Sequence, residues 1–179
     1  MTPTPSCESS VYNHLEALKP VLAGVPGACA EFGCYEGGNT CRIMMAFGRP
    51  TYGFDTFDGM PDDGYDAQLD SWNPPGKWKP RINAVKLMQD IGLYPVIGKF
   101  SDTIPVFDRE HPDIRFTFVH IDCDHYNSYK QVLAYITPRM SPGGIVIMDD
   151  YECAGAKKAV DEWMGERTWA KANWRGVQF

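Results

Sequence analysis

The sequence predicts an α/β protein with a doubly wound, mostly parallel sheet. Short apolar segments typical of buried strands alternate along the chain with segments whose apolar residues recur every three to four positions, as they do in helices. Two segments, FTFVHI at residues 116–121 and GIVIM at residues 144–148, are nearly continuous in apolar residues, as expected of strands covered on both faces. A glycine turn follows the first strand segment and leads into a helical one. Alternation of this kind indicates a parallel sheet.

The first third of the chain predicts the order helix, strand, helix, strand. Residues 1–27 should hold one N-terminal helix behind the capping serines 9 and 10, since apolar side chains recur there at helical spacing, at Val11, Leu15, Leu18 and Leu22. We expect this helix to end near residues 24–27. Residues 28–32 predict a strand, and a helix with Ile43, Met44 and Phe47 at helical spacing follows the glycine turn. Residues 51–54 predict the second strand, which ends in Asp55.

The rest of the chain continues the alternation. Apolar residues between 82 and 88 predict a short helix, and residues 94–97 predict a strand. The strands at 116–121 and 144–148 each precede a segment with helical spacing. At 179 residues, 44% of them hydrophobic, the chain is expected to form a single domain over residues 1–179 with a substantial core.

The charge and cysteine content narrow the class of protein. With 23 acidic and 17 basic side chains the net charge is −6, which argues against binding nucleic acid by neutralising many phosphates. Six cysteines without a CxxC pair indicate free thiols in a reducing compartment. Neither a signal peptide nor a run of about 18 apolar residues is visible. We therefore expect a cytoplasmic protein that does not insert into a membrane.

One segment carries the excess of acid. Between Gly53 and Gly76 the sequence has no Glu, Lys or Arg, whereas the remainder has 17 acidic and 17 basic side chains. The aspartates of this window are Asp55, Asp58, Asp62, Asp63, Asp66 and Asp70. Prolines, glycines, tyrosine and tryptophan accompany them, which is typical of a loop. Because a loop of this length in a domain is usually functional, we expect residues 56–80 to form an acidic, aromatic lid.

Acidic residues also follow nearly every expected strand, at the edge where ligands bind in open α/β sheets. Glu31 begins the turn EFGCYEGGNT, which is not GxGxxG and which suits a ligand that carries a cationic amine or hydroxyls. The alternative is that its glycines only make a tight turn. Asp55 lies near the position where an acid at the end of the second strand binds ribose hydroxyls. Its alternative is a helix cap or a surface charge.

Four carboxylates follow the two most apolar strands, and they are Asp122, Asp124, Asp149 and Asp150. Such a group would repel itself unless it is protonated or neutralised by a cation. Oxygen ligands of this kind suit Mg²⁺ or another hard divalent ion, although one or two of them could cap helices instead. His125 is a candidate base or a structural histidine, and we assign no function to His14, His111 or His120.

Five motifs together resemble one family. EFGCYEGGNT, YGFDTFDGMP, GKFSDTIP, HIDCDHYNSY and SPGGIVIMDDYECAGAKKAVDEW resemble, in order and spacing, those of the macrocin O-methyltransferase family of class I S-adenosylmethionine (SAM) dependent methyltransferases. The likeness runs from Glu31 to Trp163. It implies a Rossmann-like fold and methylation of a hydroxyl on a small molecule, such as a sugar of a natural product, with SAM and Mg²⁺ as cofactors.

The resemblance also implies roles for individual positions. Asp122, Asp149 and Asp150 fall where the family holds its metal, while Asp122 and His125 are the catalytic candidates. Asp124 is a further ligand or a polar supporter. The implied cofactor-binding residues, from the methionine-side loop through the ribose acid to the adenine pocket, are Glu31, Gly33, Tyr35, Gly37, Asn39, Thr40, Asp55, Thr56, Phe100, Ser101 and Asp122.

The chain departs from the family pattern at several places. His125 stands where many members have an apolar residue, and Tyr129 replaces the usual Thr. After Trp174 there is room for one strand rather than the antiparallel hairpin that usually finishes the fold, and exposed Trp169 and Trp174 would favour a homo-oligomer. In an enzyme of this kind the lid would become ordered on ligand binding and favour neutral or cationic acceptors.

Two other functions remain open on the sequence. Residues 122–124 also match the D-x-D of a metal-dependent glycosyltransferase, although such an enzyme does not require the turn at Glu31 or the acid at Asp55. The shortened end of the fold also allows a non-catalytic module that binds a cofactor.

Overall fold

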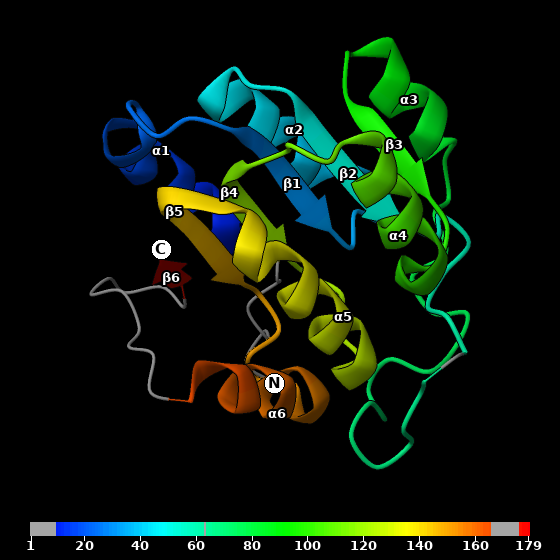
Figure 1. Cartoon of the computed structure of the whole chain (residues 1–179). Helices are drawn as coiled ribbons and strands as arrows, with labels where there is room; N and C mark the ends of the chain where they lie inside the picture. The colour runs from blue at the N-terminus through cyan, green and yellow to red at the C-terminus, as the bar shows by residue number, and fades with distance from the viewer. Residues whose placement is uncertain (1–9, 63, 166–175) are drawn as a thin grey trace, which may run out of the picture.

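The computed structural model describes residues 10–62, 64–165 and 176–179. Within them the chain forms a six-stranded sheet in the order β3-β2-β1-β4-β5-β6 (Figure 1). The strands are β1 (Ala28–Phe32), β2 (Thr51–Asp55), β3 (Tyr94–Ile97), β4 (Phe116–Ile121), β5 (Met140–Met148) and β6 (Gly176–Gln178). Neighbours from β3 through β5 are parallel, and β6 pairs with β5 in the antiparallel direction. The predicted mostly parallel sheet and the single strand after Trp174 are both confirmed, whereas Trp169 and Trp174 lie outside the described residues.

Helices cover both faces of the sheet, as a doubly wound fold requires (Figure 1). One face packs on α1 and α2, and the other packs on α4, α5 and α6. The helices are α1 (Ser10–Leu22), α2 (Gly38–Phe47), α3 (Ala84–Asp90), α4 (Phe100–Glu110), α5 (Tyr126–Ile136) and α6 (Ala154–Met164), with a 3₁₀ turn at Thr137–Arg139. None of the helices in the described part of the chain has the length and apolar character needed to cross a membrane.

Two elements differ from the sequence-based expectation. Helix α4 is not predicted by the apolar pattern, because it contains Pro105 and leaves most of its surface exposed. It forms because Phe107 packs into the core against Phe54, with the ring centroids 4.9 Å apart. Strand β5 begins at Met140 instead of residue 144, since Met140 pairs with Phe116 before the register shifts at the glycines. Tertiary pairing therefore extends structure that the local sequence does not specify.

The two central strands are covered on both faces, in agreement with their apolar composition. On one side Phe32 of β1 stacks on Phe54 of β2 with ring centroids 4.4 Å apart. On the other side the α1 leucines pack in one cluster with Cys29, Phe118 and neighbouring residues of β5. The cysteines among the described residues are all free thiols, as expected.

The strand order reverses between β1 and β4, which makes the space outside their carboxyl ends the expected crevice of this sheet. From β1 the chain continues to β2 and β3 on one side, while β4 lies on the other, and ligands bind at such a switch point. Here the two strands approach so closely that a Cβ atom on Gly33 would lie 1.7 Å from the carbonyl oxygen of Asp122. Gly33 also has a φ of 91°, so this position requires glycine.

We therefore expect Gly33→Ala to lower the free energy of unfolding by about 3 kcal/mol or more, because neither backbone can move away without opening the sheet. Urea denaturation measures this loss. Gly24→Ala is the matched control, since a Cβ at Gly24 has no atom within 4 Å. Equal stability of the two variants would contradict the close approach.

Candidate functional site

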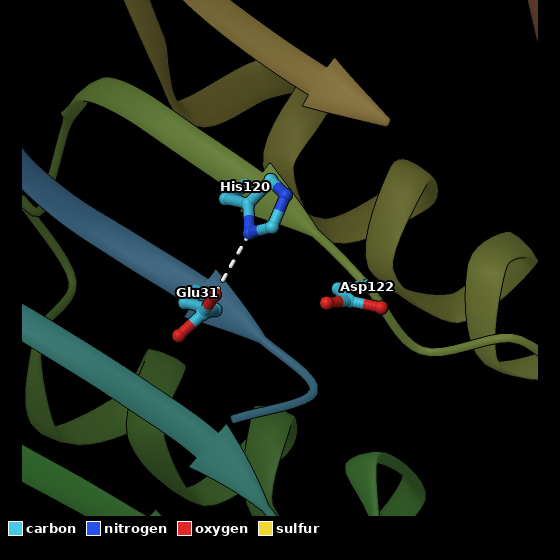
Figure 2. A group of neighbouring side chains, drawn as sticks. All are labelled: Glu31, His120 and Asp122. Atoms are coloured by element: carbon cyan, nitrogen blue, oxygen red, sulfur yellow. Dashed lines mark hydrogen bonds and ion pairs between the residues drawn. The ribbon is translucent and has the colours of Figure 1, made fainter. Parts of the chain in front are cut away.

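A buried acid–histidine pair joins the neighbouring strands β1 and β4 near their carboxyl ends (Figure 2). Glu31 and His120 face each other in the parallel register, and His120 Nδ1 lies 2.8 Å from Glu31 Oε1. The hydroxyl of Thr40 donates to the other oxygen of Glu31. All three side chains are buried, so the first turn of α2 is tied to both strands.

His120 also reaches toward the next strand. Its Nε2 lies 3.8 Å from Asp149 Oδ1, too far for a hydrogen bond but close enough for an ionic contact. Burial by itself would lower the pKa of His120, but the carboxylates of Asp149 and Glu31 outweigh it and raise the pKa to about 10. His120 is therefore a buried cation among acids. No functional signal for His120 is visible in the sequence, because its partner Glu31 lies 89 positions away in the chain.

Three carboxylates gather beside this pair. Ligand oxygens of Asp122, Asp149 and Asp150 all lie within 4.8 Å of one another, at the ends of β4 and β5. Burial raises the pKa of Asp122 and of Asp150 well above the ordinary range, and repulsion from the neighbouring aspartates raises both further. The structure thus brings the three predicted metal ligands together at a place where a cation would relieve their repulsion.

A fourth carboxylate adjoins them from the loop after β4. Asp124 has a φ of 59°, and its backbone N–H donates to Asp150 Oδ2 at 2.9 Å. The amide of Asn73 donates to the Asp124 side chain. Burial raises the pKa of Asp124 to about 6, although the charge of Lys77 opposes the shift. Tyr129, the departure from the family pattern, places its hydroxyl 3.1 Å from Asp150 Oδ2.

The glycine turn is fixed by Asp55. Its Oδ2 accepts the backbone N–H groups of Cys34 and Tyr35 at 2.8 and 2.9 Å, and its Oδ1 accepts that of Phe57 at 2.7 Å. Gly37, with a φ of 84°, then opens α2. In the structure, therefore, the Asp55 carboxylate shapes the turn that was expected to bind the cofactor.

The other expected cofactor-binding residues lie around this turn and at the start of α4. Thr56 donates to the carbonyl of Gly59 at 2.7 Å, whereas Asn39 accepts from Arg42 on the surface. Phe100 packs its ring edge against Phe32 with centroids 5.6 Å apart, and Ser101 is exposed beside it. These residues are positioned near the carboxyl edge, and their contact with a cofactor remains a prediction.

The long loop is anchored rather than free. Asp70, expected among the lid charges, is 4% exposed and accepts the backbone N–H of Tyr126 at 3.0 Å and that of Asp66 at 3.1 Å. Gly155 of α6 packs against it so closely that a Cβ there would lie 2.0 Å from Asp70 Oδ1. The interpretation of Asp70 as a lid charge is thus corrected, because it ties the loop to the starts of α5 and α6.

His125 belongs to the same anchor. It is 1% exposed, and its Nε2 lies 2.6 Å from the backbone carbonyl of Asn73, to which it donates. The ring of Tyr65 covers it, with centroids 5.5 Å apart. His125, the expected base, therefore packs against the loop, and its Nε2 is already used in a hydrogen bond. Asn73 and Asp70 were missed as site residues because nothing local distinguishes them from other polar loop residues.

Comparison with known proteins identifies the family. The sequence matches the family model described as macrocin-O-methyltransferase (TylF) over residues 11–172. The chain belongs to the macrocin O-methyltransferase family. This membership confirms the resemblance carried by the five motifs, and it does not support the interpretation of residues 122–124 as a glycosyltransferase motif.

The chain matches part of the length of two curated O-methyltransferases. It is 32% identical to the 8-demethyl-8-(2,3-dimethoxy-alpha-L-rhamnosyl)-tetracenomycin-C 4'-O-methyltransferase of Streptomyces olivaceus, over 83% of this chain and 62% of the relative. It is 28% identical to the mycinamicin III 3''-O-methyltransferase of Micromonospora griseorubida, over 78% of this chain and 61% of the relative. The chain thus spans about three fifths of the length of these curated relatives.

A solved structure supports the fold assignment. The chain superposes on CalS11, a calicheamicin methyltransferase, with a TM-score of 0.74 at 20% identity, over 94% of this chain and 78% of the other. The predicted Rossmann-like fold of the class I methyltransferases is therefore confirmed.

The raised carboxylate pKa values predict how a metal and pH act together. Because the ionised forms of Asp122 and Asp150 are penalised in the folded protein, stability should fall as pH rises above about 4, the ordinary carboxyl range, toward the raised pKa values. Mg²⁺ should offset this loss and raise Tm by about 5 °C or more at pH 8, but much less at pH 5. Calorimetric scans with Mg²⁺, compared with scans in NaCl of equal ionic strength, measure the change in Tm at each pH. An equal gain in Tm at pH 5 and pH 8 would argue against a cation site at these carboxylates.

The buried anchor predicts unequal effects of two loop aspartates. Asp70→Ala should cost about 2 kcal/mol of unfolding free energy, because it leaves the N–H groups of Tyr126 and Asp66 without their acceptor. Hydrogen exchange in the loop should also become faster. Asp58→Ala is the control and should change stability by at most about 0.5 kcal/mol, since the Asp58 side chain forms an exposed ion pair with Lys79. Similar losses in both variants would refute the anchor.

Proposed function

We propose that the protein is a SAM-dependent, Mg²⁺-assisted O-methyltransferase that acts on a hydroxyl of a small molecule, such as a sugar of a natural product. The observation that carries the proposal is the cluster Asp122, Asp149 and Asp150 beside the Glu31 turn, at the switch point of a macrocin O-methyltransferase fold. The names of the two curated relatives support the reaction, and the S. olivaceus name describes an acceptor that carries a rhamnosyl sugar.

The donor set fits a hard divalent cation. All three side chains offer oxygen ligands, remain partly open to solvent, and repel one another when ionised. Asp122, Asp149 and Asp150 would therefore hold Mg²⁺. Bound there, the ion would orient the reacting oxygens of the acceptor and lower the pKa of its hydroxyl.

Asp124 is the residue that we assign as the proton acceptor. With a pKa of about 6 it is mostly ionised at neutral pH and still basic enough to take a proton, as general base catalysis requires. His125, the other candidate, already donates its Nε2 proton to the carbonyl of Asn73. In the proposed reaction the hydroxyl oxygen forms a bond to the methyl carbon while the carbon–sulfur bond of SAM breaks. The hydroxyl proton goes to Asp124, and the products are a methyl ether and S-adenosylhomocysteine.

The remaining residues hold this arrangement in place. The amide of Asn73, on the loop, donates to the Asp124 carboxylate and fixes its orientation, and the hydroxyl of Tyr129, on α5, donates to Asp150. The bonds of Asp55 to the turn after β1 keep its backbone close to the crevice, where the cofactor is expected to bind. The acceptor would enter between the turn and the loop.

A methylation assay on a panel of glycosides, with calorimetry of S-adenosylhomocysteine, tests the proposal. Asp124→Asn should lower kcat by about 10²- to 10⁴-fold, the usual contribution of a general base, while the Kd for S-adenosylhomocysteine stays within about twofold. Asp58→Asn is the control and should leave both quantities unchanged. EDTA should also lower kcat, and Mg²⁺ should restore it.

Two results would overturn it. If the protein binds S-adenosylhomocysteine but methylates no hydroxylated acceptor, it is a cofactor-binding module without turnover. If Asp124→Asn retains full kcat, the proton is taken by another group.

A further inference from the structure

We propose that the rings of Tyr35 and Trp78 form a binding surface for the sugar ring of the acceptor. We call this pair the aromatic corner. The inference rests on the proposed function and adds to it the surface that recognises the acceptor. It is carried by the placement of the two rings, by their connection to Asp124, and by the exposed face that Trp78 retains.

The aromatic corner joins the two segments that border the crevice. Tyr35 belongs to the turn after β1, and Trp78 belongs to the long loop after β2. Their ring centroids lie 5.8 Å apart at an interplanar angle of 75°, which is an edge-to-face contact. The turn and the loop therefore meet through these two rings.

One side chain connects the corner to the carboxylates. The indole Nε1 of Trp78 donates to Asn73 Oδ1 at 2.9 Å, and the amide nitrogen of Asn73 donates to Asp124. Asn73 is itself 7% exposed and held through its backbone carbonyl by His125. A ring that lies against Trp78 is thus only one residue away from the proposed proton acceptor.

Trp78 is held in place by its neighbours, yet about half of its surface is exposed to solvent. Its side chain is 49% exposed although its only polar atom is already bonded, so the surface that it presents is apolar. Lys77 Nζ lies over one face of the ring, 4.8 Å from its centroid, and donates to Asn73 Oδ1 at 2.8 Å, so the face left for a flat ligand is the opposite one. A fixed, half-exposed indole needs little ordering when a flat ligand binds.

The backbone at both rings is also unusual. Tyr35 has a φ of 50° and Trp78 a φ of 60°, in the left-handed region that bulky residues rarely adopt. Asp55 holds the first through the Tyr35 N–H. Strained conformations of this kind are kept where surrounding contacts force them, and they concentrate at ligand sites.

The chemistry of the corner suits the C–H face of a pyranose. The π face of an indole carries partial negative charge, which attracts the weakly positive C–H groups of a sugar ring. The equatorial hydroxyls of a pyranose stacked in this way would radiate from the edge of the sugar ring, roughly parallel to the indole, and the edge of Trp78 that bonds Asn73 is the one that leads to Asp124. The corner would thus select a ring and present one of its hydroxyls for methylation.

Trp72 offers a matched control on the same loop. Trp72 is 77% exposed, and its backbone carbonyl accepts from Lys77 Nζ at 2.7 Å. A tryptophan at this position should contribute nothing specific to sugar binding.

The test is the binding of methyl α-L-rhamnoside to the full chain, with S-adenosylhomocysteine and Mg²⁺ present, followed by saturation-transfer NMR. We expect Trp78→Ala to raise the Kd by about tenfold, as the loss of one good stacking contact does, and Trp78→Phe to raise it less. Trp72→Ala should stay within about twofold. Circular dichroism and the Kd for S-adenosylhomocysteine should be unchanged in all three variants.

Aryl and alkyl glycosides separate the sugar from its substituent. If the sugar lies on Trp78, p-nitrophenyl and methyl α-L-rhamnoside should lose affinity equally in Trp78→Ala. The inference would be overturned if Trp78→Ala weakened binding of the aryl glycoside alone, or if Trp72→Ala weakened binding as much as Trp78→Ala. It would also be overturned if the wild-type protein bound no glycoside. Failure of the wild-type protein to bind S-adenosylhomocysteine would instead count against the proposed function.

Discussion

The structure depends on holding like charges together where parallel strands end. Glu31, Asp122 and Asp149 lie at the ends of three adjacent strands, and burial makes their repulsion costly. The buried His120 offsets part of this repulsion, because its Nδ1 lies 2.8 Å from Glu31 Oε1 and its Nε2 lies 3.8 Å from Asp149 Oδ1. The repulsion that remains among the aspartates bears both on stability and on the divalent cation proposed above.

The long loop lies against this charged edge. Asp70 ties the loop to the starts of α5 and α6, and Asn73 ties it to Asp124. Trp78 then closes the contact with Tyr35 on the opposite side of the crevice. The acidity of the loop thus divides by role: a buried aspartate anchors it, while exposed ones form ion pairs, such as that of Asp62 with Lys99 at 3.1 Å.

Asn73 links the parts of the site that the proposals describe separately. Its side chain bonds Trp78, Lys77 and Asp124, and its backbone carbonyl accepts from His125. A ligand that presses on the indole would therefore act on the same residue that orients the proposed base. Recognition of the acceptor and removal of its proton would be set by one rigid group of contacts.

The sequence by itself determined the parallel sheet and the acids at its carboxyl edge, because strand periodicity is local and parallel strands bring their carboxyl ends together. Only the tertiary structure decided which polar residues meet. His120 meets Glu31 because of the register between β1 and β4. Helix α4 forms where Phe107 is buried. His125 faces the loop because it donates to the carbonyl of Asn73, 52 positions away in the chain. Contacts across such separations depend on packing, which local residue patterns do not encode.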